Sequence, residues 1–178
     1  MSDKKSITII SGPVGAGKTT VAKQLVAIST GLVTYIEGDT FWGFIAKTSL
    51  NHSRNLNFKM IMTAMTAAAM SYALYGYEVI LDFSIPPWFI ETALKMGKLR
   101  DIELDYVVIK PSAEICAMRA ATRTEGIITD YSLYRELYVS FDVAARHIIS
   151  DDAATETELA KHIKEGVAQG TFRIKDGL

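Results

Sequence analysis

The sequence has little of several features that mark other classes of protein. It contains a single cysteine, Cys116, which excludes an internal disulfide and favours a reducing compartment. Its three histidines are scattered and lack the spacing of metal ligands. The formal net charge of −1 gives no field to hold a nucleic-acid backbone or an anionic membrane. Nucleic acid and membrane surfaces are therefore unexpected partners.

Signals for export or for a membrane span are missing as well. Residues 1–5 are polar and lead directly into an apolar run, so we expect no signal peptide. The most apolar long stretch, residues 60–77, contains threonine, serine and glycine and falls short of a spanning length. No repeat or linker composition divides the chain, and 178 residues suit one domain with a full core. We expect a single cytoplasmic domain, residues 1–178.

The sequence does contain a glycine-rich loop. It follows the first apolar run, residues 6–10, and that run is typical of a buried strand. The loop has the G-x-x-x-x-G-K-[ST] spacing of a phosphate-binding loop. It consists of Gly12, Pro13, Val14, Gly15, Ala16, Gly17, Lys18 and Thr19, and Thr20 follows it. The three glycines permit positive φ and carry no Cβ, so successive backbone N–H groups can converge on phosphate oxygens. We therefore expect this loop to bind a nucleoside triphosphate.

The residues at the end of the loop have separate expected roles. Lys18 would place its ammonium against the β- and γ-phosphates, and the Thr19 hydroxyl would complete the coordination of a magnesium ion. Thr20 would open a helix whose positive end faces the same anion. The rival dinucleotide fingerprint G-x-G-x-x-G fails, because the position three beyond Gly17 is Thr20. A glycine-rich turn without a ligand is the structural alternative.

A carboxylate follows the second predicted strand, residues 32–36. Asp39 would lie just past the C-terminal end of that strand, where open α/β sheets bind ligands, and it is the first candidate for chemistry. Its alternative role is an N-cap for the segment that follows, and both roles can coexist. Phe41 and Trp42 come directly after it.

A second carboxylate, Asp82, closes the third predicted strand, residues 78–84. An apolar run that ends on an aspartate has the form of a Walker B segment, in which the carboxylate holds magnesium directly or through water. Asp82 could instead contact the acceptor of a transfer reaction. Pro86, Pro87 and Trp88 then predict a loop, followed by a helix from about Phe89 to Leu99.

Basic side chains occur in two further segments. Arg54 and Lys59 belong to a polar stretch that either reaches an anionic acceptor or forms a solvated loop. Arg119 and Arg123, four residues apart on a helix that starts at Ser112, could clamp a transferring phosphate at the base of a flap. Their alternative is a solvated helix face that pairs with nearby glutamates.

The last third of the chain gives three more elements. An amphipathic helix is predicted over residues 133–144 and a short strand over 147–150. A capping box, Thr155-x-x-Glu158, predicts the start of the final helix, which Gly170 ends. Strand and helix thus alternate through five units, which favours a parallel sheet with helices on both faces.

On these motifs the chain resembles the small P-loop kinases of the nucleoside-monophosphate-kinase-like fold, which include shikimate kinase, gluconate kinase and chloramphenicol phosphotransferase. The resemblance implies a three-layer α/β/α fold with a five-stranded parallel sheet in the order 2-3-1-4-5. It also implies a short lid at about residues 119–135 and an acceptor region at about residues 40–60. ATP and Mg²⁺ would be the cofactors.

The resemblance also implies residue roles. Lys18 would be the phosphate clamp, Thr19 the magnesium ligand, and Asp39 the residue that binds the acceptor hydroxyl and takes its proton. Arg119 would face the adenine or the phosphates, and Arg123 the transferring phosphoryl group. The turn at residues 150–154, which includes Ser150, Asp151 and Asp152, would contact the adenine.

The acceptor is expected to be a small molecule with a hydroxyl group. Phe41, Trp42 and Trp88 would form an apolar wall for it, with Arg54 and Asp82 as further contacts, which favours a neutral or partly aromatic molecule. One alternative is a kinase of a nucleoside or nucleic-acid 5′-hydroxyl. Another is a nucleotide-binding switch with slow hydrolysis, although the N-K-x-D guanine motif is missing. The sequence leaves monomer and homodimer open.

Overall fold

The computed structural model describes residues 5–47, 53–124, 126–175 and 178. Five parallel strands form one sheet in the order β2-β3-β1-β4-β5, which confirms the predicted fold class and strand order. The strands are β1 (Ser6–Ser11), β2 (Val33–Glu37), β3 (Glu78–Asp82), β4 (Glu103–Ile109) and β5 (Ile148–Ile149).

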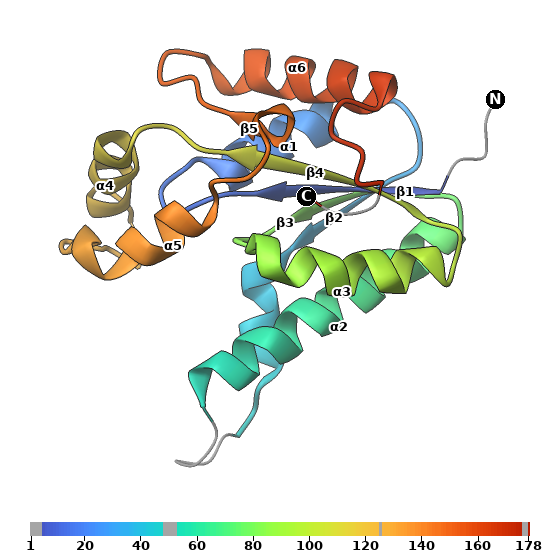
Figure 1. Ribbon diagram of the computed structural model, residues 1–178, viewed down its shortest axis with the longest axis horizontal. Coiled ribbons are helices and arrows are strands. Elements are labelled where there is room, and N and C mark those ends of the chain that lie inside the picture. The colour runs from blue at the N-terminus through green and yellow to red at the C-terminus, as the bar shows by residue number, and fades with distance from the viewer. Residues whose placement is uncertain (1–4, 48–52, 125, 176–177) are drawn as a thin grey trace.

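Helices cover both faces of this sheet (Figure 1). One face carries α1 (Lys18–Ile28) and α6 (Glu156–Gln169), and the other carries α2 (Arg54–Leu74) and α3 (Pro87–Lys98). Two short helices, α4 (Ala113–Ala121) and α5 (Arg135–Ser140), lie beyond the C-terminal ends of the strands (Figure 1). Among the described residues, no helix is both long and apolar enough to cross a membrane.

The central strand β1 supplies side chains to two separate cores. Ile7 and Ile9 pack into the larger core with α2 and α3, whereas Ile10 packs into the core formed with α1 and α6. Side chains alternate between the faces of a strand, so a strand buried on both faces is apolar at nearly every position. This explains why residues 6–10 read as a continuous apolar run.

Two helix boundaries differ from the sequence prediction. The helix α3 begins at Pro87, two residues early, because a proline at the first helical position has no N–H that needs a partner. The helix α4 ends at Ala121, so Arg123 lies beyond it, and the prediction that Arg119 and Arg123 share one helix is wrong. The N–H of Ile128 instead donates to the carbonyl of Ala120, where the chain folds back over the helix end.

The helix predicted over residues 133–144 is also interrupted. The segment consists of a 3₁₀ helix, η2 (Tyr131–Tyr134), followed by α5, which ends at Ser140. Past that point Phe141 is fully buried in the larger core, and Asp142 forms an ion pair with Lys110. Both contacts require the chain to leave the helical path.

His147, which was predicted in the last strand, lies in the 3₁₀ helix η3 (Ala145–His147).

The C-terminal tail carries no sequence pattern, yet it is a structural element. After Gly170, at φ 73°, the tail turns back along β4, and Phe172 and Ile174 are buried. Arg173 donates from Nε and Nη2 to the two carboxylate oxygens of Asp105, at 3.0 and 3.1 Å. Asp105 is fully buried, so the tail supplies the charge that this carboxylate needs.

Candidate active site

The phosphate loop lies between β1 and α1 and is packed tightly against β4 and α4. Gly12, Gly15 and Gly17 all have positive φ, at 138°, 83° and 91°. A Cβ on Gly12 would lie 2.1 Å from the carbonyl oxygen of Ile109, and a Cβ on Gly15 would lie 2.1 Å from that of Cys116. These two positions require glycine both for their backbone conformation and for the close approach.

Lys18 lies at the centre of the site. Its side chain is buried, and its Nζ donates a hydrogen bond of 2.9 Å to the carbonyl of Pro13. Burial lowers the pKa of Lys18 most strongly, and the nearby positive charge of Arg123 lowers it further. The negative charges of Asp82 and Asp39 act in the opposite direction on that pKa. The lysine is thus within electrostatic reach of both predicted carboxylates and of Arg123.

Asp82 and Thr19 form an oxygen-rich pair beside the lysine. The Thr19 hydroxyl lies near Asp82, and the Tyr35 hydroxyl donates to Asp82 Oδ2 at 3.2 Å. Burial raises the pKa of the Asp82 carboxyl, although both hydroxyls favour its charged form. Hydroxyl and carboxylate oxygens are the ligands that magnesium prefers, so this pair fits the ion.

Larger groups of metal ligands are absent: within the described ranges, no three His, Cys, Asp or Glu side chains are placed to hold a metal. Magnesium commonly keeps several waters and binds through one or two protein groups plus substrate phosphates. The small donor set is therefore consistent with a magnesium ion that arrives with a nucleotide.

A cleft of about 860 Å³ opens beside the phosphate loop at the C-terminal ends of the strands. It brings together ten of the predicted site residues: Gly15, Ala16, Gly17, Lys18, Thr19, Thr20, Asp39, Arg119, Arg123 and Asp151. Segments from the first and the last third of the chain thus meet in one cavity.

Asp39 is exposed and lines this cleft in the 3₁₀ helix η1 (Gly38–Phe44). The N-cap of η1 is Glu37, and Asp39 accepts no hydrogen bond from the residues that the structure describes, which argues against the capping role. Gly38 sets the position of the aspartate, because a Cβ there would lie 2.7 Å from the ring of Phe83. The turn after β2 therefore presses against the end of β3 and turns the Asp39 side chain out to the cavity.

The two predicted lid arginines reach the cleft by different routes. Arg119 extends from α4, and its Nη1 donates to the carbonyl of Ala16 at 3.4 Å. Arg123 lies in the segment after α4, near enough to Lys18 to lower its pKa. The structure thus places both cations beside the phosphate loop, although they do not share a helix.

The turn at residues 150–154 contributes less to the cleft than expected. The Ser150 hydroxyl donates to the carbonyl of Lys110, and Asp152 Oδ1 accepts from the backbone N–H of Ser112 at 2.8 Å. These two side chains brace the turn against β4 and α4, and only Asp151 of the predicted three lines the cavity.

Most of the predicted acceptor residues lie outside the cleft. Phe41 and Trp42 are half-buried against the larger core, and Trp88 is 56% exposed in the first turn of α3. Arg54 is exposed at the start of α2. The structure does not bring these four side chains into the wall of the cavity. Gly12, Pro13, Val14 and Asp82 are not among the lining residues either.

Several lining residues were missed by the sequence analysis. Glu37 precedes Asp39 by two positions at the same strand end, so its position gave a usable signal. Thr122, Thr124, Glu156 and Leu159 gave none, because they reach the cavity only through the positions at which α4 ends and α6 begins. Tyr131 is not among the lining residues, and its contact gave no signal either, because its hydroxyl donates to the Val14 carbonyl at 2.7 Å across 117 positions of sequence.

The chain matches known proteins in its structure but not in its sequence. No family model matches the sequence, and no curated protein matches it significantly. Among solved structures, APS kinase of Mycobacterium tuberculosis, determined in complex with AMPPNP and APS, is similar at a TM-score of 0.71 and 17% identity. The match covers 92% of this chain and 97% of that one.

Two further structures give the same result. The tunicamycin resistance protein of Deinococcus radiodurans is similar at a TM-score of 0.70 and 16% identity over 96% of this chain and 98% of its own. Shikimate kinase from Acinetobacter baumannii, in complex with shikimate, is similar at a TM-score of 0.59 and 16% identity over 93% of each chain. The protein therefore has the α/β fold of the P-loop kinases, as the sequence motifs predicted.

Proposed function

We propose that this protein is a kinase that transfers the γ-phosphoryl group of ATP to a hydroxyl group of a small molecule. One observation carries the proposal: the phosphate-binding loop lines the same cleft as the carboxylate of Asp39, which has no hydrogen-bond or ion-pair partner among the described residues. Lys18 of the loop lies within electrostatic reach of this carboxylate. A nucleotide switch needs the loop but not the carboxylate. The P-loop kinase fold of APS kinase and shikimate kinase supports the same assignment.

In the proposed reaction the protein mainly positions charge. Asp39 would accept a hydrogen bond from the acceptor hydroxyl and take its proton as the oxygen attacks the γ-phosphorus. The bond from that phosphorus to the bridging oxygen would break, and ADP would leave with the electron pair. Lys18 and Arg123 would hold the phosphoryl oxygens while their charge redistributes.

Magnesium fits the pair formed by Thr19 and Asp82, which would hold it through a hydroxyl and a carboxylate. When bound, the ion neutralises charge on the phosphates. Asp82 needs to be ionised for this role, and the nearby hydroxyls of Tyr35 and Thr19 favour that form against the effect of burial. We therefore assign Asp82 to the metal rather than to the acceptor.

The charges in the cleft favour a neutral acceptor. Among the described residues, the cations that line it are Lys18, Arg119 and Arg123, which gather around the loop, where the triphosphate would use them. The side of the cavity formed by the turn after β2 carries Glu37 and Asp39 instead. An acceptor with its own phosphate or carboxylate would meet like charge there.

We also propose residues about 40–60 as the acceptor region and residues about 119–135 as the lid.

The test is release of ADP in a coupled assay against a panel of alcohols, sugars, nucleosides and hydroxylated antibiotics. We expect one chemical class to raise ADP release well above the rate without acceptor. ATP binding without product across the whole panel would contradict a kinase and favour the switch. An acceptor affinity that falls steeply with salt would instead favour a nucleic-acid 5′-hydroxyl.

A further inference from the structure

The phosphate loop is held from outside by a tyrosine of the lid. Tyr131 lies in η2, and its hydroxyl donates a hydrogen bond of 2.7 Å to the carbonyl oxygen of Val14. This is the residue just before Gly15, at the tip of the loop. The bond joins two segments separated by 117 positions, so it is a contact made by the fold and not by local sequence.

The geometry of the peptide group gives this contact a consequence inside the loop. A trans peptide is planar, and its C=O and N–H point in opposite directions. A hydrogen bond that fixes the Val14 carbonyl toward η2 therefore turns the N–H of Gly15 away from η2. Gly15 lines the cleft, and no described residue accepts a hydrogen bond from its N–H. That donor is left for an anion in the cavity.

A second contact repeats the arrangement two residues further on. Arg119 Nη1 donates to the carbonyl of Ala16 at 3.4 Å, which fixes the peptide that carries the N–H of Gly17. Gly17 also lines the cleft. The carbonyls of Val14 and Ala16 are thus held from outside by η2 and α4, and the N–H groups of Gly15 and Gly17 in the same peptides are oriented as an anion nest.

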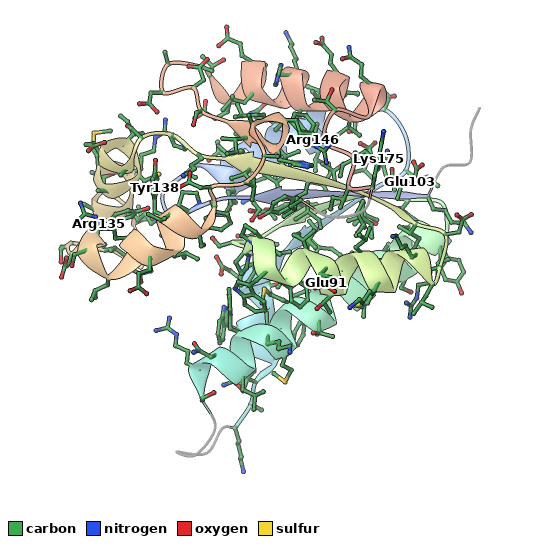
Figure 2. The ribbon with its side chains drawn as sticks, viewed as in Figure 1. Glu91, Glu103, Arg135, Tyr138, Arg146 and Lys175 are labelled. Carbon is green, nitrogen blue, oxygen red and sulfur yellow. The ribbon has the colours of Figure 1, made fainter. Side chains whose placement is uncertain are left out.

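Tyr131 itself is fixed by its own surroundings. The Asp130 side chain caps η2 by accepting from the N–H of Ser132 at 3.0 Å, and the ring of Tyr131 packs at 5.9 Å from that of Tyr134. One helical segment later, the Tyr138 hydroxyl donates to the carbonyl of Pro111 at 2.9 Å. Figure 2 shows Tyr138 projecting from α5 toward the end of β4. Tyr131 is therefore held in η2 by the Asp130 cap and by the ring of Tyr134, whereas the Tyr138 hydrogen bond fixes the next helix, α5.

We propose that Tyr131 is a positioning residue for the phosphate loop: by holding the Val14 carbonyl, its hydroxyl orients the Gly15 N–H toward the β-phosphate of the bound nucleotide. The inference rests on the proposed nucleotide site. It makes the lid part of the donor site even before an acceptor binds. It also predicts that the hydroxyl matters for nucleotides with a β-phosphate and not for those without one.

The experiment compares Tyr131→Phe with two matched controls, Tyr134→Phe and Tyr138→Phe. Tyr134 lies in the same 3₁₀ helix, and Tyr138→Phe removes a similar lid hydrogen bond whose acceptor is outside the loop. Dissociation constants for ADP and AMP are measured by displacement of a fluorescent ADP analogue from the full chain. Exchange of the backbone amides of residues 12–17 is followed by mass spectrometry.

For Tyr131→Phe we expect ADP affinity to fall about fivefold, the factor that one neutral hydrogen bond of about 1 kcal/mol gives. AMP affinity should not change, and the loop amides should exchange faster. Both controls should keep the ADP affinity of the wild type. Equal ADP affinity in Tyr131→Phe and wild type, or an equal loss for ADP and AMP, would overturn the positioning role. No ADP binding by the wild type would instead overturn the proposed function on which it rests.

Discussion

Lys18 Nζ donates a hydrogen bond of 2.9 Å to the carbonyl oxygen of Pro13, so the lysine side chain lies back against the phosphate loop that carries it. The ammonium has two further N–H donors, so a phosphate oxygen can bind it beside this carbonyl. A charged phosphate forms a stronger hydrogen bond with the ammonium than a neutral carbonyl does, which favours the nucleotide.

Replacement of this lysine separates catalysis from folding. We expect Lys18→Ala to lower ADP release at least about 100-fold, as loss of a preorganised donor to a transferring phosphoryl group does. Burial of the ammonium is unfavourable, as the lowered pKa of Lys18 shows, so the variant should unfold at a urea concentration no lower than wild type. Lys95→Ala, which removes an exposed lysine on α3, is the control. Full activity of Lys18→Ala would remove the lysine from the mechanism.

Asp39→Asn tests the acceptor side of the cleft. The amide cannot take the proton of the acceptor hydroxyl, so the transfer rate should fall about 10²- to 10⁴-fold. ADP affinity should stay within about twofold of wild type, because Asp39 lies outside the phosphate loop. Glu91→Gln, on the outer face of α3 (Figure 2), is the matched control. An unchanged transfer rate would leave Asp39 with no catalytic role.

The raised pKa of Asp82 predicts how the stability of an Asp82→Asn variant, relative to wild type, depends on pH. Burial raises the pKa of this carboxyl above its ordinary value of 3.8, so the folded protein binds its proton more tightly than the unfolded chain does. Its ionisation therefore costs stability at every pH above the raised pKa. Asp82→Asn should be as stable as wild type or more stable at pH 7. This difference should shrink as the pH falls below the raised pKa and vanish below the ordinary value of 3.8.

Function should respond to Asp82→Asn in the opposite way. The variant is expected to lose the dependence of ADP affinity on magnesium, because a neutral amide is a weaker ligand for the ion. Thermal melts at several pH values and ADP titrations with and without magnesium measure the two effects. A less stable variant at pH 7 that keeps its magnesium dependence would contradict both assignments.

The tail contact between Arg173 and Asp105 predicts a large effect far from the cleft. Arg173→Ala would leave a fully buried carboxylate without its partner, which costs about 3 kcal/mol of unfolding free energy. The double variant with Asp105→Asn should recover much of that loss, because the fully buried carboxylate is then replaced by a neutral amide, and Glu103, the other ion-pair partner of Arg173, is partly exposed. Urea denaturation of the two single variants and the double variant measures the coupling. Strictly additive losses would show that the pair does not act as a unit.

Much of the fold could be predicted because its signals are local. The glycine spacing of the loop, the serine cap of α4, and the capping box of α6 each depend on residues within a few positions of one another, and the structure contains all three. The strand order came from the resemblance that these motifs support, and the structure confirms it.

The site was predicted less completely, because it depends on contacts over long separations. Phe141 and Asp142 end α5 early through contacts with the core and with Lys110, and nothing in their own segment shows this. Tyr131 and Val14 meet only because η2 folds over the loop. Phe41 and Trp42 are apolar enough to pack against the core, so composition could not distinguish a substrate wall from a core contact.

The central claim is that the phosphoryl group goes to an acceptor hydroxyl and not to water. Phosphorus NMR of the wild-type protein with ATP, magnesium and the acceptor class found in the panel follows both products at once. We predict a phosphomonoester resonance that grows in step with ADP while inorganic phosphate stays minor. Growth of ADP with inorganic phosphate alone would contradict the account and identify a nucleotide hydrolase.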